Sequence, residues 1–182
     1  MYDTTKRDWP GDFVCCRDGI TLVPVYHEQL PVGMLHEAWR RTEEDGLMER
    51  VFQRPMTHEQ FVAYFANRST HTLLIFEHRN LQGYCWLNGV SEHRAFLHFC
   101  LFKTVWGRSE IFGQHAIDYW FAVPGDSGPL LRVLIGSTPT DNRLAIRLSK
   151  RLGFKPIGEI PYMAGDKPCM ISYRLRDDLI EV

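Results

Sequence analysis

The chain has 182 residues, of which 45% are hydrophobic and 13% aromatic, enough apolar material for a substantial core. Its formal net charge of −1 argues against nucleic-acid partners and gives no attraction to anionic membranes. No apolar run approaches the roughly 20 residues of a membrane span, and the polar first residues lack a signal-peptide block. We therefore expect a cytoplasmic single domain over 1–182, with an extension at 1–18 and a core at about 19–175.

The cysteines and histidines lack the spacing of a metal site. Five cysteines occur without a CxxC pair, and eight histidines without an HxxxH or HExxH pair. The odd number of cysteines also argues against a disulfide framework. We expect no bound metal, and we interpret Cys100 as buried apolar filler, not as a nucleophile.

The first half of the chain predicts one strand, two helices and then three strands. Gly19–Val25 is rich in β-branched residues, which favours a strand. Leu30–Glu44 and Thr57–Arg68 have the apolar spacing of helices, and Thr57 suits the N-cap of the second. The three following strands form a meander and span Thr70–Arg79, Leu81–Val90 and Arg94–Lys103.

The second half predicts helices that alternate with strands. Ser109–Ala122 has helical spacing, and Leu130–Thr138 is nearly all apolar, as in a strand buried on both faces. Asp141–Gly153 is a second helix, and Phe154–Pro161 and Lys167–Leu175 are closing strands. The order predicts a mixed α/β domain, one sheet with helices on both faces.

The helix predicted at Asp141–Gly153 has clear end signals. Asp141 or Thr140 can accept hydrogen bonds from its first amides, and Gly153 suits the left-handed conformation that ends helices. The residues expected to face the sheet are Leu144, Leu148 and Leu152. A second stripe is basic and consists of Arg143, Arg147, Lys150 and Arg151. Such a stripe is either a solvated surface or a place where one or two cations meet a ligand phosphate.

The segment LFKTVWGRSEIFG connects a predicted strand to a predicted helix through a turn that contains Gly107. Free backbone N–H groups and the positive end of the helix meet there, as in many phosphate sites. Gly113 lies inside the helix, at a cost of about 1 kcal/mol relative to alanine. We therefore expect a neighbouring backbone or a ligand to come close to Gly113.

Together these segments resemble the GNAT superfamily of N-acetyltransferases, especially its ribosomal-protein-alanine acetyltransferase branch. VLIGSTPTDNRLAIRLSKRLGFKPIGEIP is similar to that family's strand, Asn-led helix and closing Gly-Phe. Gly107 falls on the central glycine of its pyrophosphate loop, (Arg/Gln)-x-x-Gly-x-(Gly/Ala). Asp118, Tyr119 and Phe121 fall on the Asp-Tyr-x-Phe end of the next helix. The final third also resembles acetyltransferase-like proteins of bacteriophages.

The resemblance covers most of Gly19–Leu175, and four positions depart from the family pattern. In the loop, Thr104 replaces Arg or Gln and Ser109 replaces Gly or Ala. In the later helix, Ala145 replaces a frequent Ser, and Ser149 stands where many members have a tyrosine general acid. The cofactor cradle is therefore altered, and the usual proton donor is absent.

The resemblance implies a mostly antiparallel sheet in which the strands at Arg94–Lys103 and Leu130–Thr138 splay apart to hold acetyl-CoA. The implied cofactor-binding residues are Leu101, Phe102, Lys103, Val105, Gly107, Arg108, Ser109, Glu110, Asn142 and Arg147. Two of them also have simpler interpretations. Gly107 can be an ordinary turn glycine, and Asn142 can be a helix-start residue that bonds its own backbone.

The implied reaction is direct attack of a primary amine on acetyl-CoA in a ternary complex, the amine being a small molecule, a protein N-terminus or a lysine. It needs a neutral amine, a donor for the carbonyl oxygen and a proton for the leaving thiolate. The resemblance places the donor in the backbone near Leu101 and Phe102. For the acid we consider Ser149 and Tyr162.

His98 is the candidate base, because histidine titrates in the useful range. It can equally be a packed core histidine, and Glu92 and His93 are the alternatives at the start of the same strand. The resemblance implies that the first two helices and the Tyr162–Lys167 turn shape the acceptor site.

Residues near that site allow more than one interpretation. Trp39, Phe61 and Phe65 either line a pocket or form core, and the acidic run of Glu43, Glu44 and Asp45 either attracts an amine or is solvated. The alternative function is a non-catalytic GNAT-like protein that binds CoA or serves interaction or assembly, for example in a phage, and Thr104 and Ser149 favour it. The sequence leaves open whether the chain forms a homodimer.

Overall fold

The computed structural model describes residues 15–125 and 128–179. Its main sheet contains eight strands, in the order β1-β2-β3-β4-β5-β8-β10-β9. In chain order these are β1 (Cys15–Arg17), β2 (Ile20–Val25), β3 (His71–Glu77), β4 (Asn80–Ser91), β5 (Arg94–Leu101), β8 (Val133–Pro139), β9 (Lys155–Ala164) and β10 (Lys167–Leu175). Neighbouring strands pair antiparallel, except β5 and β8, which are parallel.

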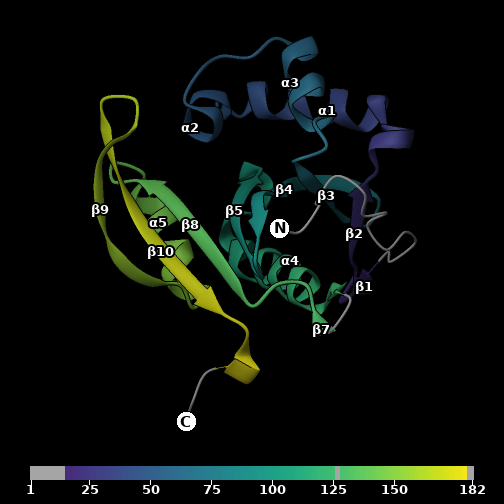
Figure 1. Ribbon diagram of the computed structural model, residues 1–182. Helices are drawn as coiled ribbons and strands as arrows, with labels where there is room; N and C mark the ends of the chain where they lie inside the picture. The colour runs from purple at the N-terminus through teal and green to yellow at the C-terminus, as the bar shows by residue number, and fades with distance from the viewer. Residues whose placement is uncertain (1–14, 126–127, 180–182) are drawn as a thin grey trace.

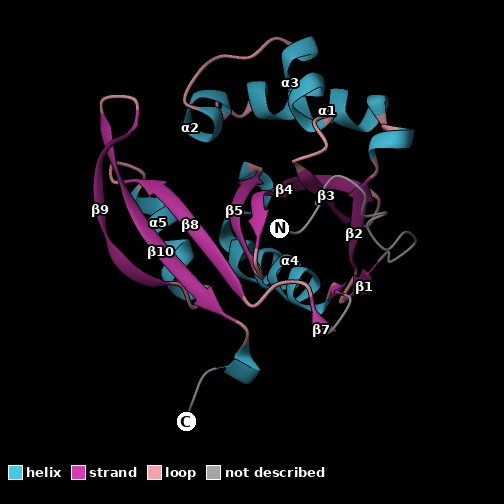
Figure 2. Cartoon of the chain, in the orientation of Figure 1, coloured by secondary structure: helices cyan, strands magenta, loops and turns pink. Residues whose placement is uncertain are grey.

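Helices cover both faces of this sheet, as predicted (Figure 1). The helices α1 (Val32–Glu44), α2 (Met48–Phe52) and α3 (His58–Phe65) lie on one face. The other face carries α4 (Ser109–Ala122) and α5 (Arg143–Arg151), as the cyan helices of Figure 2 show. The α/β class and the mixed, mostly antiparallel sheet are therefore confirmed. None of the described helices is long and apolar enough to cross a membrane.

The central strands are buried on both faces, and β4 shows this best. Its residues alternate between two cores: Tyr84 and Trp86 pack with α1 and α3, whereas Cys85 and Leu87 pack with α4. Successive side chains of a strand point to opposite faces, so an unbroken apolar run supplies both cores at once. A side chain's place on β4 or β5 therefore fixes the face on which it acts.

Several elements differ from the sequence prediction. The helix α2, the strand β1 and the two-strand unit of β6 (Pro124–Gly125) with β7 (Gly128–Pro129) were not predicted, because segments of two to five residues show no measurable periodicity. The strand predicted at Leu130–Thr138 begins later, at Val133. Its first residues instead bond to the β4–β5 turn, where the amide of Arg132 donates to the His93 carbonyl over 2.7 Å.

Gly113 is close to a neighbour, as expected, but the neighbour is a side chain. A Cβ at Gly113 would lie 2.7 Å from Cδ1 of Leu152, just after α5. The missing side chain lets α4 and the end of α5 pack tightly. Gly153 has φ of 79° directly after Leu152, so the predicted end of that helix is confirmed.

Candidate functional site

The strands β5 and β8 form a seam that is paired for only part of its length. Their parallel pairing covers three residue pairs, from Arg94 with Val133 to Phe96 with Ile135. Beyond these pairs the strands diverge (Figure 1), and a cleft of about 590 Å³ lies between them. The predicted splayed strand pair is therefore present.

The diverging part of β5 has an unpaired backbone edge toward this cleft. The His93 carbonyl faces β8, since it accepts from Arg132 and Val133, whereas the Phe102 amide faces β4 and donates to the Gln82 carbonyl. Alternate residues of a strand direct their backbone groups to opposite edges. It follows that the odd-numbered residues of β5 face the cleft; beyond the seam these are Leu97, Phe99 and Leu101.

The expectation that Phe102 offers a free donor is thus wrong. Its amide is bonded to Gln82, and its side chain is fully buried. On the cleft side, the Leu101 carbonyl accepts from Nε1 of Trp106 over 2.9 Å. The backbone donors left beside the cleft are the amides of Phe99 and Leu101.

The loop after β5 is a 3-10 helix, Lys103–Arg108, that runs directly into α4. Two of its amides are already bonded: Lys103 donates to Oδ2 of Asp45 over 2.7 Å, and Val105 donates to the Phe102 carbonyl over 3.0 Å. Gly107 differs from them. No heavy atom lies within 4 Å of a Cβ built there, and Gly107 lines the cleft. The point of this loop where a ligand can approach the backbone without meeting a side chain is therefore Gly107.

Three side chains of this loop have distinct positions. Arg108 forms two hydrogen bonds of 2.8 and 2.7 Å with the carboxylate of Glu77, which lowers the pKa of Glu77. The hydroxyl of Ser109 donates to the Trp106 carbonyl over 3.0 Å. Glu110 and Ser109 line the cleft, whereas Arg108 does not.

The start of α5 is capped by Asn142, so the prediction of Asp141 or Thr140 as cap is wrong. Oδ1 of Asn142 accepts from the Ala145 amide over 3.2 Å. This agrees with the simpler interpretation of Asn142, as a helix-start residue that bonds its own backbone. Asp141 instead binds Nζ of Lys167, which lowers the Asp141 pKa. Asn142 also lines the cleft.

The apolar stripe of α5 is only partly buried. Leu152 is in the core and Leu148 packs against it, but Leu144 is 54% exposed and lines the cleft. The prediction that all three leucines pack on the sheet is wrong for Leu144, because β5 and β8 have separated there. On the same helix Ser149 lies with its Oγ 3.3 Å from Oγ of Ser172.

His98 lines the cleft on the side of α1–α3. Its ring stacks on Trp86 at 4.9 Å, and its Nε2 lies 3.2 Å from Oδ1 of Asn88. Burial lowers the His98 pKa to about 4, so the ring is neutral near pH 7. Because Asn88 Oδ1 accepts, Nε2 carries the hydrogen and Nδ1 is the acceptor.

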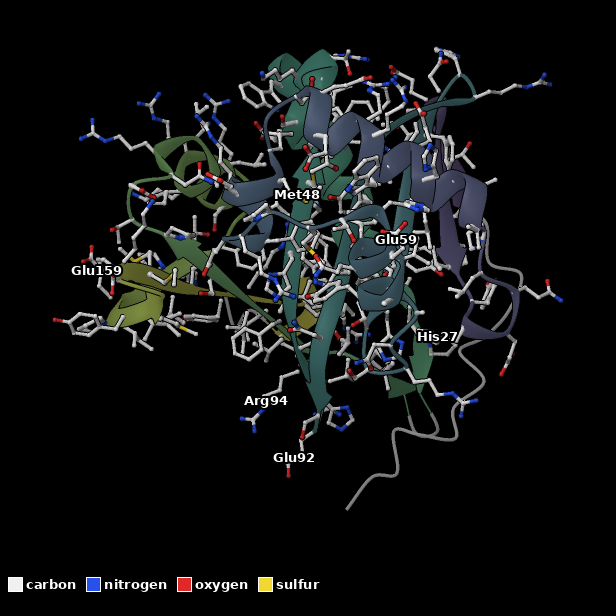
Figure 3. All side chains as sticks on the ribbon, turned by 90° about the horizontal axis from the view of Figure 1, so that it is seen from above. His27, Met48, Glu59, Glu92, Arg94 and Glu159 are labelled. Carbon is white, nitrogen blue, oxygen red and sulfur yellow. The ribbon has the colours of Figure 1, made fainter. Side chains whose placement is uncertain are left out.

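Three other candidates, Tyr162, Glu92 and His93, do not line the cleft. Tyr162 is 79% exposed on β9, and Glu92 projects from the β4–β5 hairpin, away from Met48 of α2 (Figure 3). Nδ1 of His93 is 3.1 Å from the Leu130 carbonyl. Cys100 is buried, which raises its pKa to about 12 and makes it a poor nucleophile.

The three candidate aromatic residues of the first helices, Trp39, Phe61 and Phe65, do not line the cleft. Phe61 and Phe65 are fully buried, and Nε1 of Trp39 donates to the Met56 carbonyl over 3.0 Å. In the acidic run, Glu44 pairs with Arg40, and Asp45 holds the Lys103 amide. Among the residues of the structure, no group of three could hold a metal ion.

The cleft is lined from both faces of the sheet, and we call its two sides the α4–α5 opening and the α2 opening. The α4–α5 opening is lined by Gly107, Ser109, Glu110, Arg147 and Arg151. The α2 opening is lined by Arg50, Phe52, Arg54, Tyr64, Trp86 and His98. Apart from His98, sequence reasoning missed this second group, because no motif marks it.

An eight-stranded mixed sheet opened by a three-pair parallel seam has the fold of the GNAT N-acetyltransferases. The ribosomal L7/L12 alpha-N-protein acetyltransferase RimL, solved with coenzyme A, is similar with a TM-score of 0.70, at 14% identity over 90% of this chain and 98% of that chain. The ribosomal-protein-S5-alanine acetyltransferase from Vibrio fischeri has a TM-score of 0.69, at 12% identity over 93% of this chain and 100% of that chain.

A third similar structure is spermidine N-acetyltransferase from Vibrio cholerae, in complex with CoA and spermine. Its TM-score is 0.69, at 13% identity over 91% of this chain and 100% of that chain. No family model matches the sequence, and neither does any curated protein. At these identities the likeness shows the fold, and the activity has to be argued from the site.

Proposed function

We propose that the protein transfers an acetyl group from acetyl-CoA to a primary amine, a small molecule or a protein amino group. The observation that carries this proposal is the divergence of β5 and β8 beyond three pairs, which leaves a cleft lined from both faces of the sheet. An acetyl donor that enters from one face and an amine that enters from the other meet between the strands. This arrangement suits direct attack in a ternary complex. Similar folds solved with CoA or acetyl-CoA support this choice of donor.

The α4–α5 opening fits acetyl-CoA. The open position at Gly107 lets a phosphate approach the backbone, and Arg147 and Arg151 line the cleft without a salt bridge to any described residue. The unpaired edge at Phe99 and Leu101 can bond amides of the pantetheine arm. When bound, the cofactor supplies an acyl group activated as a thioester.

Two of the expected cofactor contacts, Phe102 and Arg108, change in this proposal. The Phe99 and Leu101 amides replace that of Phe102 as donors to the acyl oxygen, because Phe102 is bonded to Gln82. Arg108 is held by Glu77, so Arg147 becomes the main phosphate ligand beside Gly107.

His98 is the proposed proton acceptor. With a pKa of about 4, it cannot remove a proton from a free alkylammonium ion to any useful extent. The amine must therefore arrive neutral, and Nδ1 of His98 takes its proton while the nitrogen bonds to the acyl carbon and becomes acidic. Ser149 is the candidate donor to the leaving thiolate, and Tyr162 is left out because it does not line the cleft.

Calorimetry with acetyl-CoA and a thiol-release assay over an amine panel test the proposal. We expect micromolar binding and measurable release, with kcat lowered about 100-fold or more in His98→Ala. His78→Asn is the matched control, since His78 is exposed in a turn with φ of 47°. Absence of acetyl-CoA binding at millimolar concentration would overturn the proposal.

A non-catalytic CoA-binding or interaction protein is the second candidate. The bonded Lys103 amide, the Asn142 side chain used as a helix cap and the carboxylate of Glu110 in the cleft favour it. Acetyl-CoA binding without thiol release for any amine would select this alternative.

A further inference from the structure

The α2 opening contains two arginines with no carboxylate partner. Arg50 and Arg54 are exposed and line the cleft, and neither forms a salt bridge within the described part of the chain. The charge of Arg50 lowers the pKa of Asp141, but less than Lys167 does. The carboxylate of Asp141 is hydrogen-bonded to Lys167 and not to Arg50. These two cations are therefore available to an anion.

Negative charge is scarce in the whole cleft. Among the lining residues, Glu110 is the only carboxylate, and it belongs to the α4–α5 opening. The acidic run at the end of α1 is engaged elsewhere, through Glu44 with Arg40 and Asp45 with the Lys103 amide. Cations without counter-charges repel a polyamine and attract an acceptor that carries negative charge.

Beside the arginines is a wall of stacked aromatic rings. The rings of Phe52, Trp86 and His98 are stacked, with interplanar angles of 12° and 13° about Trp86. Tyr64 borders them, and its hydroxyl oxygen accepts from Nε1 of Trp86 over 3.0 Å, so its own hydrogen can be donated. Such a wall favours an acceptor whose amine is attached to an apolar or aromatic group.

We propose that the acceptor is a small primary amine that also bears a carboxylate or phosphate group. Arg50 and Arg54 bind this anion, and the amine lies at His98, where it gives up its proton as the amide bond forms. This inference rests on the proposed function, and it selects an acceptor class that the fold leaves open.

Matched acceptor pairs test it in the thiol-release assay. Phenylalanine is compared with phenethylamine, which lacks only the carboxylate, and O-phosphoethanolamine with ethanolamine; spermidine is the polyamine. After correction for the neutral amine fraction, we expect kcat/KM at least about 10-fold higher for the anionic member of one pair, in keeping with a charged hydrogen bond. The pair in which the anionic member reacts faster shows whether the site prefers a carboxylate or a phosphate.

Variants locate the anion site. Arg50→Gln and Arg54→Gln should each raise KM for the anionic acceptor about 10-fold with little change in kcat, because both contacts precede the reaction. Arg68→Gln is the matched control, an exposed arginine just beyond α3 that does not line the cleft. Loss of kcat with KM unchanged would overturn the assignment.

A binding readout separates this inference from the proposed function. Calorimetry of the protein with N-acetylphenylalanine, and with N-acetyl-O-phosphoethanolamine, should show binding of one of them that Arg54→Gln weakens about 10-fold. Binding of one of these compounds without any acetyl-CoA binding would defeat the proposed function and keep the anion site. Acetyl transfer to spermidine and to the uncharged amines in preference to the anionic ones would defeat the inference and keep the function.

Discussion

The two sides of the β5–β8 seam are packed very differently. On one side, β3, β4 and β5 are covered on both faces, and Trp86 of β4 is 2% exposed. On the other, β9 is exposed over nearly its whole length, with Ile157 67% exposed. The comparison shows that the cleft lies at the boundary between a rigid, doubly covered half and a thinner half that supplies the second wall.

The largest expected effect is in the packed half. Trp86→Ala removes a buried ring that stacks on Phe52 and His98, and we expect a loss of about 4 kcal/mol in the free energy of unfolding. Ile157→Ala on β9 should change it by less than about 0.5 kcal/mol. Urea denaturation measures both, and equal losses would break the comparison.

A pH titration of stability tests the same half. Burial lowers the pKa values of His71 and His98 to about 4, below the unfolded value of about 6.5. The folded state therefore resists protonation: stability is full above pH 6.5 and falls as the pH drops toward 4, by about 3 kcal/mol for each histidine. In His71→Phe, the free energy of unfolding should fall about half as steeply with decreasing pH. A free energy of unfolding that does not change with pH in the native chain would contradict the burial of the two histidines.

Two glycine substitutions sharpen the comparison further. A Cβ at Gly83 of β4 would lie 2.4 Å from the Cys100 carbonyl oxygen, whereas one at Gly158 of β9 meets no atom within 4 Å. We expect Gly83→Ala to cost about 2 kcal/mol through displacement of β5, and Gly158→Ala to be close to neutral. The midpoint temperature of thermal unfolding distinguishes the two variants. Similar midpoints would show that β4 and β5 can move apart at little cost in stability.

The smallest effect concerns the boundary. Gly107→Glu places a carboxylate at the open position beside the cleft, and we expect about 10-fold weaker acetyl-CoA binding with unchanged folding stability. Calorimetry measures the affinity, and Gly158→Ala serves as the control. Unchanged affinity in Gly107→Glu would show that phosphate does not lie there.

The sequence predicted the parts of the fold that have long, regular patterns. The helix α4, the end of α5 at Gly153 and the parting of β5 from β8 follow from periodicity and from the family resemblance. It named Asp141 or Thr140 as the cap in place of Asn142, since all three side chains suit that role and the lysine that engages Asp141 lies 26 residues away.

The α2 opening was beyond prediction for a different reason. The helix α2 has five residues, too few for an amphipathic pattern, and Arg50 and Arg54 stand in an ordinary polar stretch. Their place beside Trp86 and His98 depends on how α1–α3 dock on the sheet. Leu144 was misassigned because its exposure follows from the strand separation and not from its helix.

The hydrogen bond from the Lys103 amide to Asp45 has a consequence for motion in the molecule. Asp45 is the residue that ends α1, at the corner before α2, and Lys103 begins the segment that leads to Gly107. One carboxylate thus ties the end of α1 to the loop that leads into α4. A displacement of the end of α1 therefore has to break this bond or carry Lys103 with it.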